Sequence, residues 1–152
     1  MIDEEIRQRI LKLAFYGDEK LLQAFCEKLR VGLPAGTAVA LRGSVVTNAR
    51  HEDGKPFDAS GKGTSDLDVT LIGSEVMELW EKDAFYIPKL HTKPLNDQDS
   101  SVAPGLDSLR QELQRIVRRP VSFQATANMI LFARDVLFDQ PYYTLIKADE
   151  KE

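Results

Sequence analysis

Two aspartates one residue apart are the feature of this sequence that most directly suggests chemistry. Asp66 and Asp68 lie in the segment Gly63–Ile72, whose β-branched and apolar residues predict a strand. Because strand side chains alternate between faces, both carboxylates share one face and the apolar side chains share the other. Two like charges this close repel each other unless water, a proton or a cation intervenes. Mg²⁺ suits such a pair, because it takes oxygen ligands and commonly uses one or two carboxylates together with substrate phosphates.

A Gly-Ser pair supplies a second polar feature, 22 positions before Asp66 when counted from Ser44. The apolar run Ala38–Leu41 predicts a strand that ends near Gly43 and turns into a helix. The first backbone N–H groups of a helix lack partners within it, and the helix dipole favours an anion there. Gly43 allows a phosphate to approach the backbone, and the Ser44 hydroxyl can donate a hydrogen bond to it. If the two strands are neighbours, a phosphate site and a cation site meet at one edge of a sheet.

Together these segments resemble the motif of the DNA polymerase beta-like nucleotidyltransferase superfamily. In that motif a strand ends in Gly-Ser, the next strand carries Asp-x-Asp, and a later strand adds a third carboxylate. Leu41–Ser44 and Ser65–Val69 match the first two parts, and the resemblance covers residues 37–73 closely and 120–147 loosely. It implies a small, minimal-type nucleotidyltransferase that moves a nucleoside monophosphate from a nucleoside triphosphate such as ATP to an acceptor hydroxyl. Mg²⁺ or Mn²⁺ would be the cofactor.

The resemblance also implies roles for particular residues. Asp66 and Asp68 would hold the metal and act as the catalytic carboxylates. The expected nucleotide-binding and phosphate-binding residues are Gly43, Ser44, Lys62 and Ser65. The charged stretch 48–62 forms an inserted loop whose ends are tied to both motifs, so it could close over a bound nucleotide or could simply be a solvated connection.

The chain departs from the superfamily pattern at the third carboxylate. The candidate strand, residues 120–124, has Ser122 and Gln124 where the pattern has Asp or Glu, and Asp135 and Asp139 lie in the next predicted helix. An amide oxygen coordinates Mg²⁺ weakly and cannot act as a general base, and two-metal catalysis normally needs the extra charge. One alternative is therefore a catalytically degenerate fold that binds nucleotide or a protein partner, as a regulatory or antitoxin-like module. Another is a partner chain that supplies the missing carboxylate or the acceptor site.

Length and composition predict one globular domain over residues 1–152, with 43% hydrophobic and 29% charged residues. The net charge of −4 argues against binding long nucleic acid through a basic surface, whereas a nucleotide with its own metal remains compatible. A single cysteine excludes an internal disulfide, and two histidines are too few for a Cys/His zinc pattern. No apolar run is long enough to cross a membrane, and the acidic N-terminus is unlike a signal peptide, which predicts a cytoplasmic location.

Hydrophobic periodicity predicts the elements that must position these residues. Residues 1–33 form a pair of amphipathic helices, and residues 37–147 form the core that contains the sheet. The resulting fold class is α/β (α+β), with a small mixed β-sheet flanked by helices.

Within that core, a short helix follows Ser74, and residues 86–104 are expected to be irregular. Two longer helices are expected at Gly105–Arg119 and Asn128–Asp139, and residues 141–146 are expected to add an edge strand. The first of these helices carries four arginines that its apolar pattern places outward, Arg110, Arg115, Arg118 and Arg119.

Overall fold

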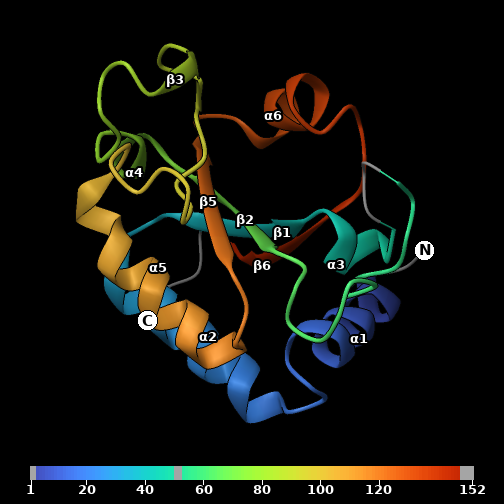
Figure 1. The fold of residues 1–152 in the computed structure, drawn as a ribbon. Coiled ribbons are helices and arrows are strands. Elements are labelled where there is room, and N and C mark those ends of the chain that lie inside the picture. The colour runs from blue at the N-terminus through green and yellow to red at the C-terminus, as the bar shows by residue number, and fades with distance from the viewer. Residues whose placement is uncertain (1–2, 50–52, 148–152) are drawn as a thin grey trace.

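The computed structural model describes residues 3–49 and 53–147 (Figure 1). The elements in chain order are α1 (Asp3–Ala14), α2 (Glu19–Gly32), β1 (Ala38–Arg42), α3 (Ser44–Thr47), β2 (Leu67–Ile72), α4 (Ser74–Met77), β3 (Phe85–Ile87), β4 (His91–Thr92), α5 (Pro104–Val117), β5 (Val121–Thr126), α6 (Met129–Asp135) and β6 (Tyr142–Ile146). The fold is a mixed α+β fold with its first two helices at the N-terminus, as the sequence predicts.

The strands of the described residues form one six-stranded mixed sheet with the order β3-β4-β5-β2-β1-β6. The strands that carry the two motifs, β1 and β2, are antiparallel neighbours, and β2 is parallel to β5. The predicted edge strand is confirmed, because β6 pairs with β1 at one end of the sheet. The condition set by the sequence, that the two motif strands be neighbours, is therefore met.

Helices cover the two faces of the sheet unequally. Figure 1 shows α1, α2 and α5 on one side of the sheet and α6 on the other. The alternating residues Leu67, Val69 and Leu71 of β2 are fully buried and join the core cluster with apolar residues of the three longer helices. The amphipathic pattern of the N-terminal helical pair is thus explained by burial against the sheet.

The opposite face of the sheet carries a row of polar side chains. The strand register places Arg42, Asp68 and Ser122 side by side, because Arg42 pairs with Asp68 and Asp68 pairs with Ser122. Thr70 and Gln124 form the next pair along the same two strands. This is the face that α6 covers, and it is where the third position of the superfamily motif falls.

Four expectations about individual elements are wrong. The stretch predicted to be irregular contains β3 and β4, which are three and two residues long and therefore too short to show an alternating pattern. The helix predicted to run to Asp139 ends at Asp135, and both Phe138 and Asp139 have positive φ. The strand predicted from Gly63 begins at Leu67, so Asp66 lies just before it.

The fourth correction concerns the arginines of α5 and its C-terminal end. Arg110 and Arg119 were expected to face outward, yet the two residues are only 1% and 3% exposed. Carboxylates make this burial possible: Arg110 pairs with Asp107 of its own helix and with Asp97 before the helix, and Arg119 pairs with Asp58. Hydrophobic periodicity treats every charge as solvent-facing and cannot reveal such partners.

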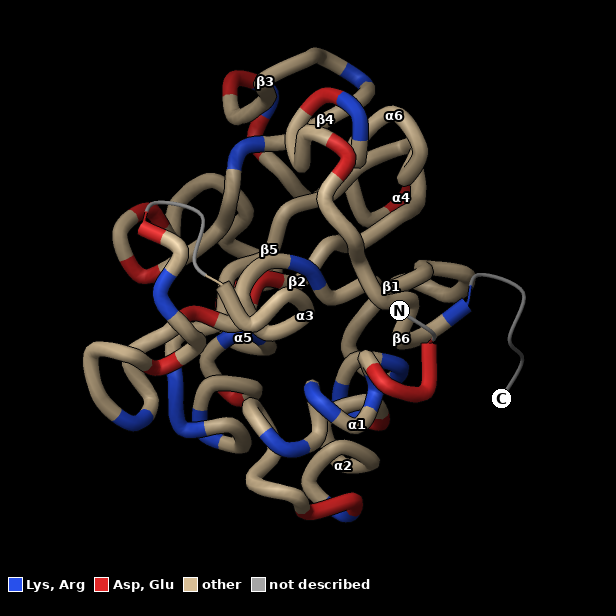
Figure 2. The backbone as a smooth tube through the Cα atoms, turned by 90° about the vertical axis from the view of Figure 1, so that its right-hand side faces the viewer, with Lys and Arg blue, Asp and Glu red and all other residues tan. Residues whose placement is uncertain are grey.

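Charged residues of both signs are interspersed along the chain, with blue and red segments following each other over the whole tube in Figure 2. Within residues 3–49 and 53–147, no helix has both the length and the hydropathy that a membrane crossing requires.

Candidate functional site

Gly43 and Asp68 meet where β1 ends. Gly43 has φ +82° and ψ −154°, a conformation that is essentially restricted to glycine. A Cβ atom built on Gly43 would lie 2.7 Å from Asp68 Oδ2. The carboxylate therefore packs directly against the glycine Cα, and no larger residue fits there without displacing it. We call Gly43, Ser44, Asp66 and Asp68 the Gly-Asp corner.

Ser44 opens a very short helix. The four-residue helix α3 runs from Ser44 to Thr47, and the next residue, Asn48, has a left-handed conformation. The N–H groups of Val46 and Thr47 both donate to the Gly43 carbonyl, at 2.9 and 3.2 Å, so the turn at Gly43 is fixed by its own backbone. The predicted strand-to-helix turn is present, although one turn of helix contributes only a small dipole.

The two aspartates differ in their surroundings. Asp66 is exposed and lies immediately before β2, whereas Asp68 is half-buried within β2. Within the part of the chain that the structure describes, no three His, Cys, Asp or Glu side chains lie close enough together to hold a metal ion. Cations that bind proteins together with substrate phosphates commonly take only one or two protein carboxylates, the number that Asp66 and Asp68 offer.

Gln124 occupies the third position of the motif, and both ends of its amide are used. Arg42 Nη2 donates to Gln124 Oε1 at 2.8 Å, while Gln124 Nε2 donates to the Thr92 carbonyl at 2.8 Å. Arg42 Nε also donates to Thr70 Oγ1 at 2.9 Å. These bonds fix the Gln124 amide in one orientation on the polar face of the sheet.

Arg42 places a positive charge in the row where the motif expects a third carboxylate. Burial lowers the pKa of the Arg42 guanidinium, and the negative charge of Asp68 opposes that shift. The ring of Phe132 in α6 lies 5.4 Å from the guanidinium carbon and covers it. Arginine remains protonated in proteins, so this charge disfavours a second metal ion beside Gln124.

The remaining predicted nucleotide contacts have other partners in this structure. The exposed Lys62 side chain places its ammonium 5.2 Å from the centroid of the Tyr16 ring, at the end of α1. Ser65 is buried, and its Oγ accepts a hydrogen bond from the Asp58 N–H at 2.7 Å. The lysine has the length and exposure to reorient toward a ligand, whereas the serine is part of the loop that leads into Asp66.

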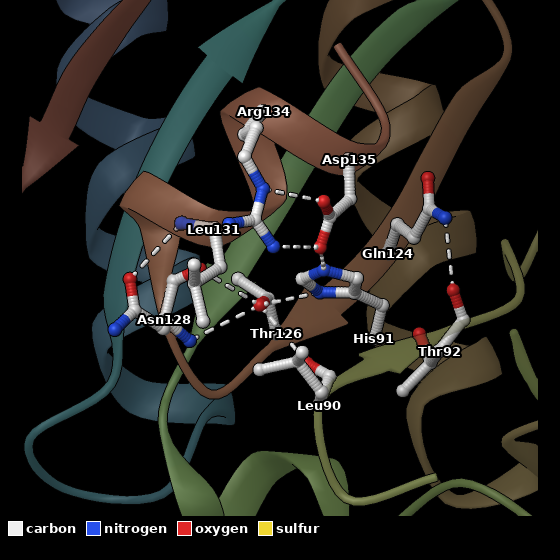
Figure 3. A network of polar contacts seen from close by, with 9 residues as sticks. All are labelled: Leu90, His91, Thr92, Gln124, Thr126, Asn128, Leu131, Arg134 and Asp135. Atoms are coloured by element: carbon white, nitrogen blue, oxygen red, sulfur yellow. Dashed lines mark hydrogen bonds and ion pairs between the residues drawn. The ribbon is translucent and has the colours of Figure 1, made fainter. Parts of the chain in front are cut away.

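A histidine–carboxylate pair on the polar face was not predicted from the sequence. His91 is fully buried in β4, and its Nε2 lies 3.0 Å from Asp135 Oδ2 while its Nδ1 lies 2.9 Å from Thr126 Oγ1 (Figure 3). A hydrogen bond from Arg134 and a second from His91 lower the pKa of Asp135 to about 2. The ionised Asp135 carboxylate thus links α6 to the sheet through its contact with His91. Asp135 and His91 are 44 positions apart, so no local sequence pattern could predict that they pair.

Comparisons with known proteins add no family to these observations. No protein-family model, no curated protein and no solved structure matches this chain. The resemblance of the Gly-Asp corner to the nucleotidyltransferase motif therefore stays a prediction that rests on the residues themselves.

Proposed function

We propose that the Gly-Asp corner binds a nucleoside triphosphate together with Mg²⁺ or Mn²⁺, and that the chain transfers the nucleoside monophosphate to an acceptor hydroxyl. The observation that carries this proposal is the contact between the Asp68 carboxylate and the Cα of Gly43. A phosphate seated on the Gly43-Ser44 turn would lie beside a cation held by Asp68. A metal-bound triphosphate needs both contacts at once.

Each residue of the corner has a distinct role in this proposal. The missing side chain of Gly43 lets the Asp68 carboxylate lie against the turn on which the phosphate is seated, and the Ser44 hydroxyl donates a hydrogen bond to that phosphate. Asp66 and Asp68 provide the carboxylate oxygens for the cation, which when bound neutralises charge on the phosphates. The exposed Lys62 side chain is proposed as a further contact to the same phosphates, which requires its ammonium to leave the ring of Tyr16.

The transfer step forms a bond from the acceptor oxygen to the α-phosphorus and breaks the bond from that phosphorus to pyrophosphate. The hydroxyl proton must pass to a base, and an amide such as Gln124 cannot accept it. Because Asp66 and Asp68 hold the cation in this proposal, we assign that role to a non-bridging phosphate oxygen of the triphosphate itself. A cytoplasmic location, where triphosphates and Mg²⁺ are both available, belongs to the same proposal.

A second candidate function is binding without transfer. The fixed amide of Gln124 and the positive charge of Arg42 favour it, because neither group can accept a proton or supply the negative charge that a second metal needs. Such a chain would act as a regulatory or antitoxin-like module that binds a nucleotide or a protein partner.

Pyrophosphate release separates the two candidates. The chain is incubated with Mg²⁺ and each triphosphate carrying a label on its α phosphate, and pyrophosphate and labelled products are measured. Release that stops in Asp68→Asn, and persists in a matched variant of an exposed aspartate far from the corner, Asp83→Asn, supports transfer. Metal-dependent binding without release supports the second candidate. If the chain neither binds a triphosphate nor releases pyrophosphate, both transfer and nucleotide binding are contradicted, and only the protein-binding form of the second candidate stands.

A further inference from the structure

Asp58 holds the segment that leads into Asp66. The Asp58 N–H donates to Ser65 Oγ at 2.7 Å, and the Asp58 carboxylate accepts hydrogen bonds from the N–H groups of Ser65 at 2.9 Å and Gly63 at 3.2 Å. These three bonds close residues 58–65 into a compact loop. Asp58 has a φ of +62°, a left-handed conformation that aspartate adopts more readily than most residues.

Arg119 binds this loop from the junction between α5 and β5. Its guanidinium donates to both carboxylate oxygens of Asp58, from Nη1 to Oδ1 at 2.7 Å and from Nη2 to Oδ2 at 3.0 Å. The guanidinium carbon also lies 4.5 Å from the centroid of the Phe57 ring. A buried, two-point arginine–carboxylate pair is geometrically specific, so it fixes the loop relative to the sheet.

Arg119 and its neighbour hold both peptide groups that flank Asp66. Arg119 Nη1 donates to the Ser65 carbonyl at 3.1 Å, and that carbonyl belongs to the peptide joining Ser65 to Asp66. The next peptide, between Asp66 and Leu67, donates its N–H to the Pro120 carbonyl at 2.8 Å. Asp66 lies outside β2, yet its backbone is anchored on both sides by consecutive residues of another segment.

We propose that Asp58 and Arg119 are positioning residues for Asp66, fixing the direction from which its carboxylate meets the cation of a bound nucleotide. This inference rests on the proposed function of the Gly-Asp corner. Arg119 is buried and acts through the Ser65 carbonyl, and Asp58 acts by orienting Arg119 and the loop. Residues that orient metal ligands typically change metal affinity by about 10- to 100-fold when they are lost.

Helix α5, which ends just before Arg119, offers a matched control in Arg110. Like Arg119 it is buried, forms ion pairs with carboxylates and donates to a backbone carbonyl, that of Val121 at 3.2 Å. It contacts neither peptide group beside Asp66. Arg110→Lys and Arg119→Lys both keep the charge and lose the fork of the guanidinium, so both are expected to lower stability. Only Arg119→Lys should also affect Asp66.

The test measures binding of Mn²⁺·ATP by isothermal titration calorimetry, at a temperature well below the melting temperature of every variant. We expect about 10-fold or greater loss of affinity in Arg119→Lys and Asp58→Asn, and a change within about twofold in Arg110→Lys. Asp58→Asn preserves the size of the side chain and carries the test if Arg119→Lys does not fold. Hydrogen exchange of the Leu67 amide, measured without nucleotide, should be faster in Arg119→Lys by more than its loss of global stability explains, and faster in Arg110→Lys only by that loss.

Each outcome bears on a different claim. If the wild type binds Mn²⁺·ATP and Arg119→Lys, Asp58→Asn and Arg110→Lys all bind equally well, the positioning role is overturned while the proposed function stands. If the wild type does not bind Mn²⁺·ATP or any other metal-bound triphosphate, the proposed function is overturned and the positioning role falls with it. Selective loss in Arg119→Lys and Asp58→Asn supports both.

Discussion

Gln124 presents its oxygen to Arg42 and its nitrogen to the Thr92 carbonyl, with 2.8 Å between the bonded atoms in both cases. The amide is matched to its surroundings, because one end faces a donor and the other faces an acceptor. A glutamate at this position could still accept the hydrogen bond from Arg42. It could not donate to the Thr92 carbonyl, and its negative charge would lie beside that carbonyl oxygen. The departure from the nucleotidyltransferase motif is therefore built into the hydrogen bonding of the sheet face and is not confined to one side chain.

Gln124→Glu should destabilise the fold. The Thr92 carbonyl would lose its donor and face a negative charge, at a cost of about 1–3 kcal/mol that an ion pair with Arg42 offsets only in part. Urea unfolding at neutral pH measures the change. Gln114→Glu is the control, because Gln114 Oε1 accepts from Arg110 Nη1 and from the Val121 N–H, and a carboxylate can keep both bonds. Equal losses in the two variants would contradict this explanation.

Gly43→Ala should lose nucleotide binding as well as stability. The new Cβ would lie 2.7 Å from Asp68 Oδ2, and the backbone conformation at Gly43 is unfavourable for alanine by about 1–3 kcal/mol. Gly36→Ala is the control, since Gly36 has a similar φ of +84° and no atom within 4 Å of a built Cβ. Thermal melting with and without Mg²⁺·ATP compares the two. A nucleotide-induced shift that survives in Gly43→Ala would argue against a phosphate on this turn.

Ionised Asp135 should make the free energy of unfolding depend on pH in the acidic range. Its pKa is about 2 in the folded chain, below the ordinary value of 3.8. Because folding lowers the pKa, the ionised carboxylate stabilises the fold at neutral pH, and this contribution is lost as the pH falls from about 4 toward 2. Asp135→Asn should lower the free energy of unfolding at neutral pH and flatten its decline over that range. Parallel pH profiles for the variant and the wild type would show that Asp135 does not contribute in this way.

The sequence was most informative where a pattern is local. Periodic apolar residues predicted α1, α2 and α5, and β-branched runs predicted the motif strands, because each pattern reports which face of one element is buried. The meeting of Gly43 with Asp68 followed from a single further condition, that the two motif strands be neighbours.

The features that were not predicted depend on partners far away in the sequence. The short strands β3 and β4 are defined by pairing across the sheet. Strand β3 pairs with β4, and β4 pairs with β5, where His91 lies opposite Thr126. Arg119 is buried because Asp58, 61 positions earlier, folds back onto it. The orientation of the Gln124 amide depends on Arg42, 82 positions away, and on Thr92, 32 positions away. Local patterns of hydrophobicity and charge carry no information about such contacts.

Metal-dependent nucleotide binding by the Gly-Asp corner is tested most directly by thermal melting with each triphosphate, in the presence and absence of Mg²⁺ or Mn²⁺. A ligand at about 100 times its dissociation constant stabilises a protein by about 2.7 kcal/mol, which shifts the melting temperature of a domain of this size by several degrees. We predict a metal-dependent shift in the wild type that is absent from the double variant Asp66→Asn/Asp68→Asn, which should remain folded. An equal shift in wild type and double variant would contradict the site, and no shift with any nucleotide would contradict the proposed function.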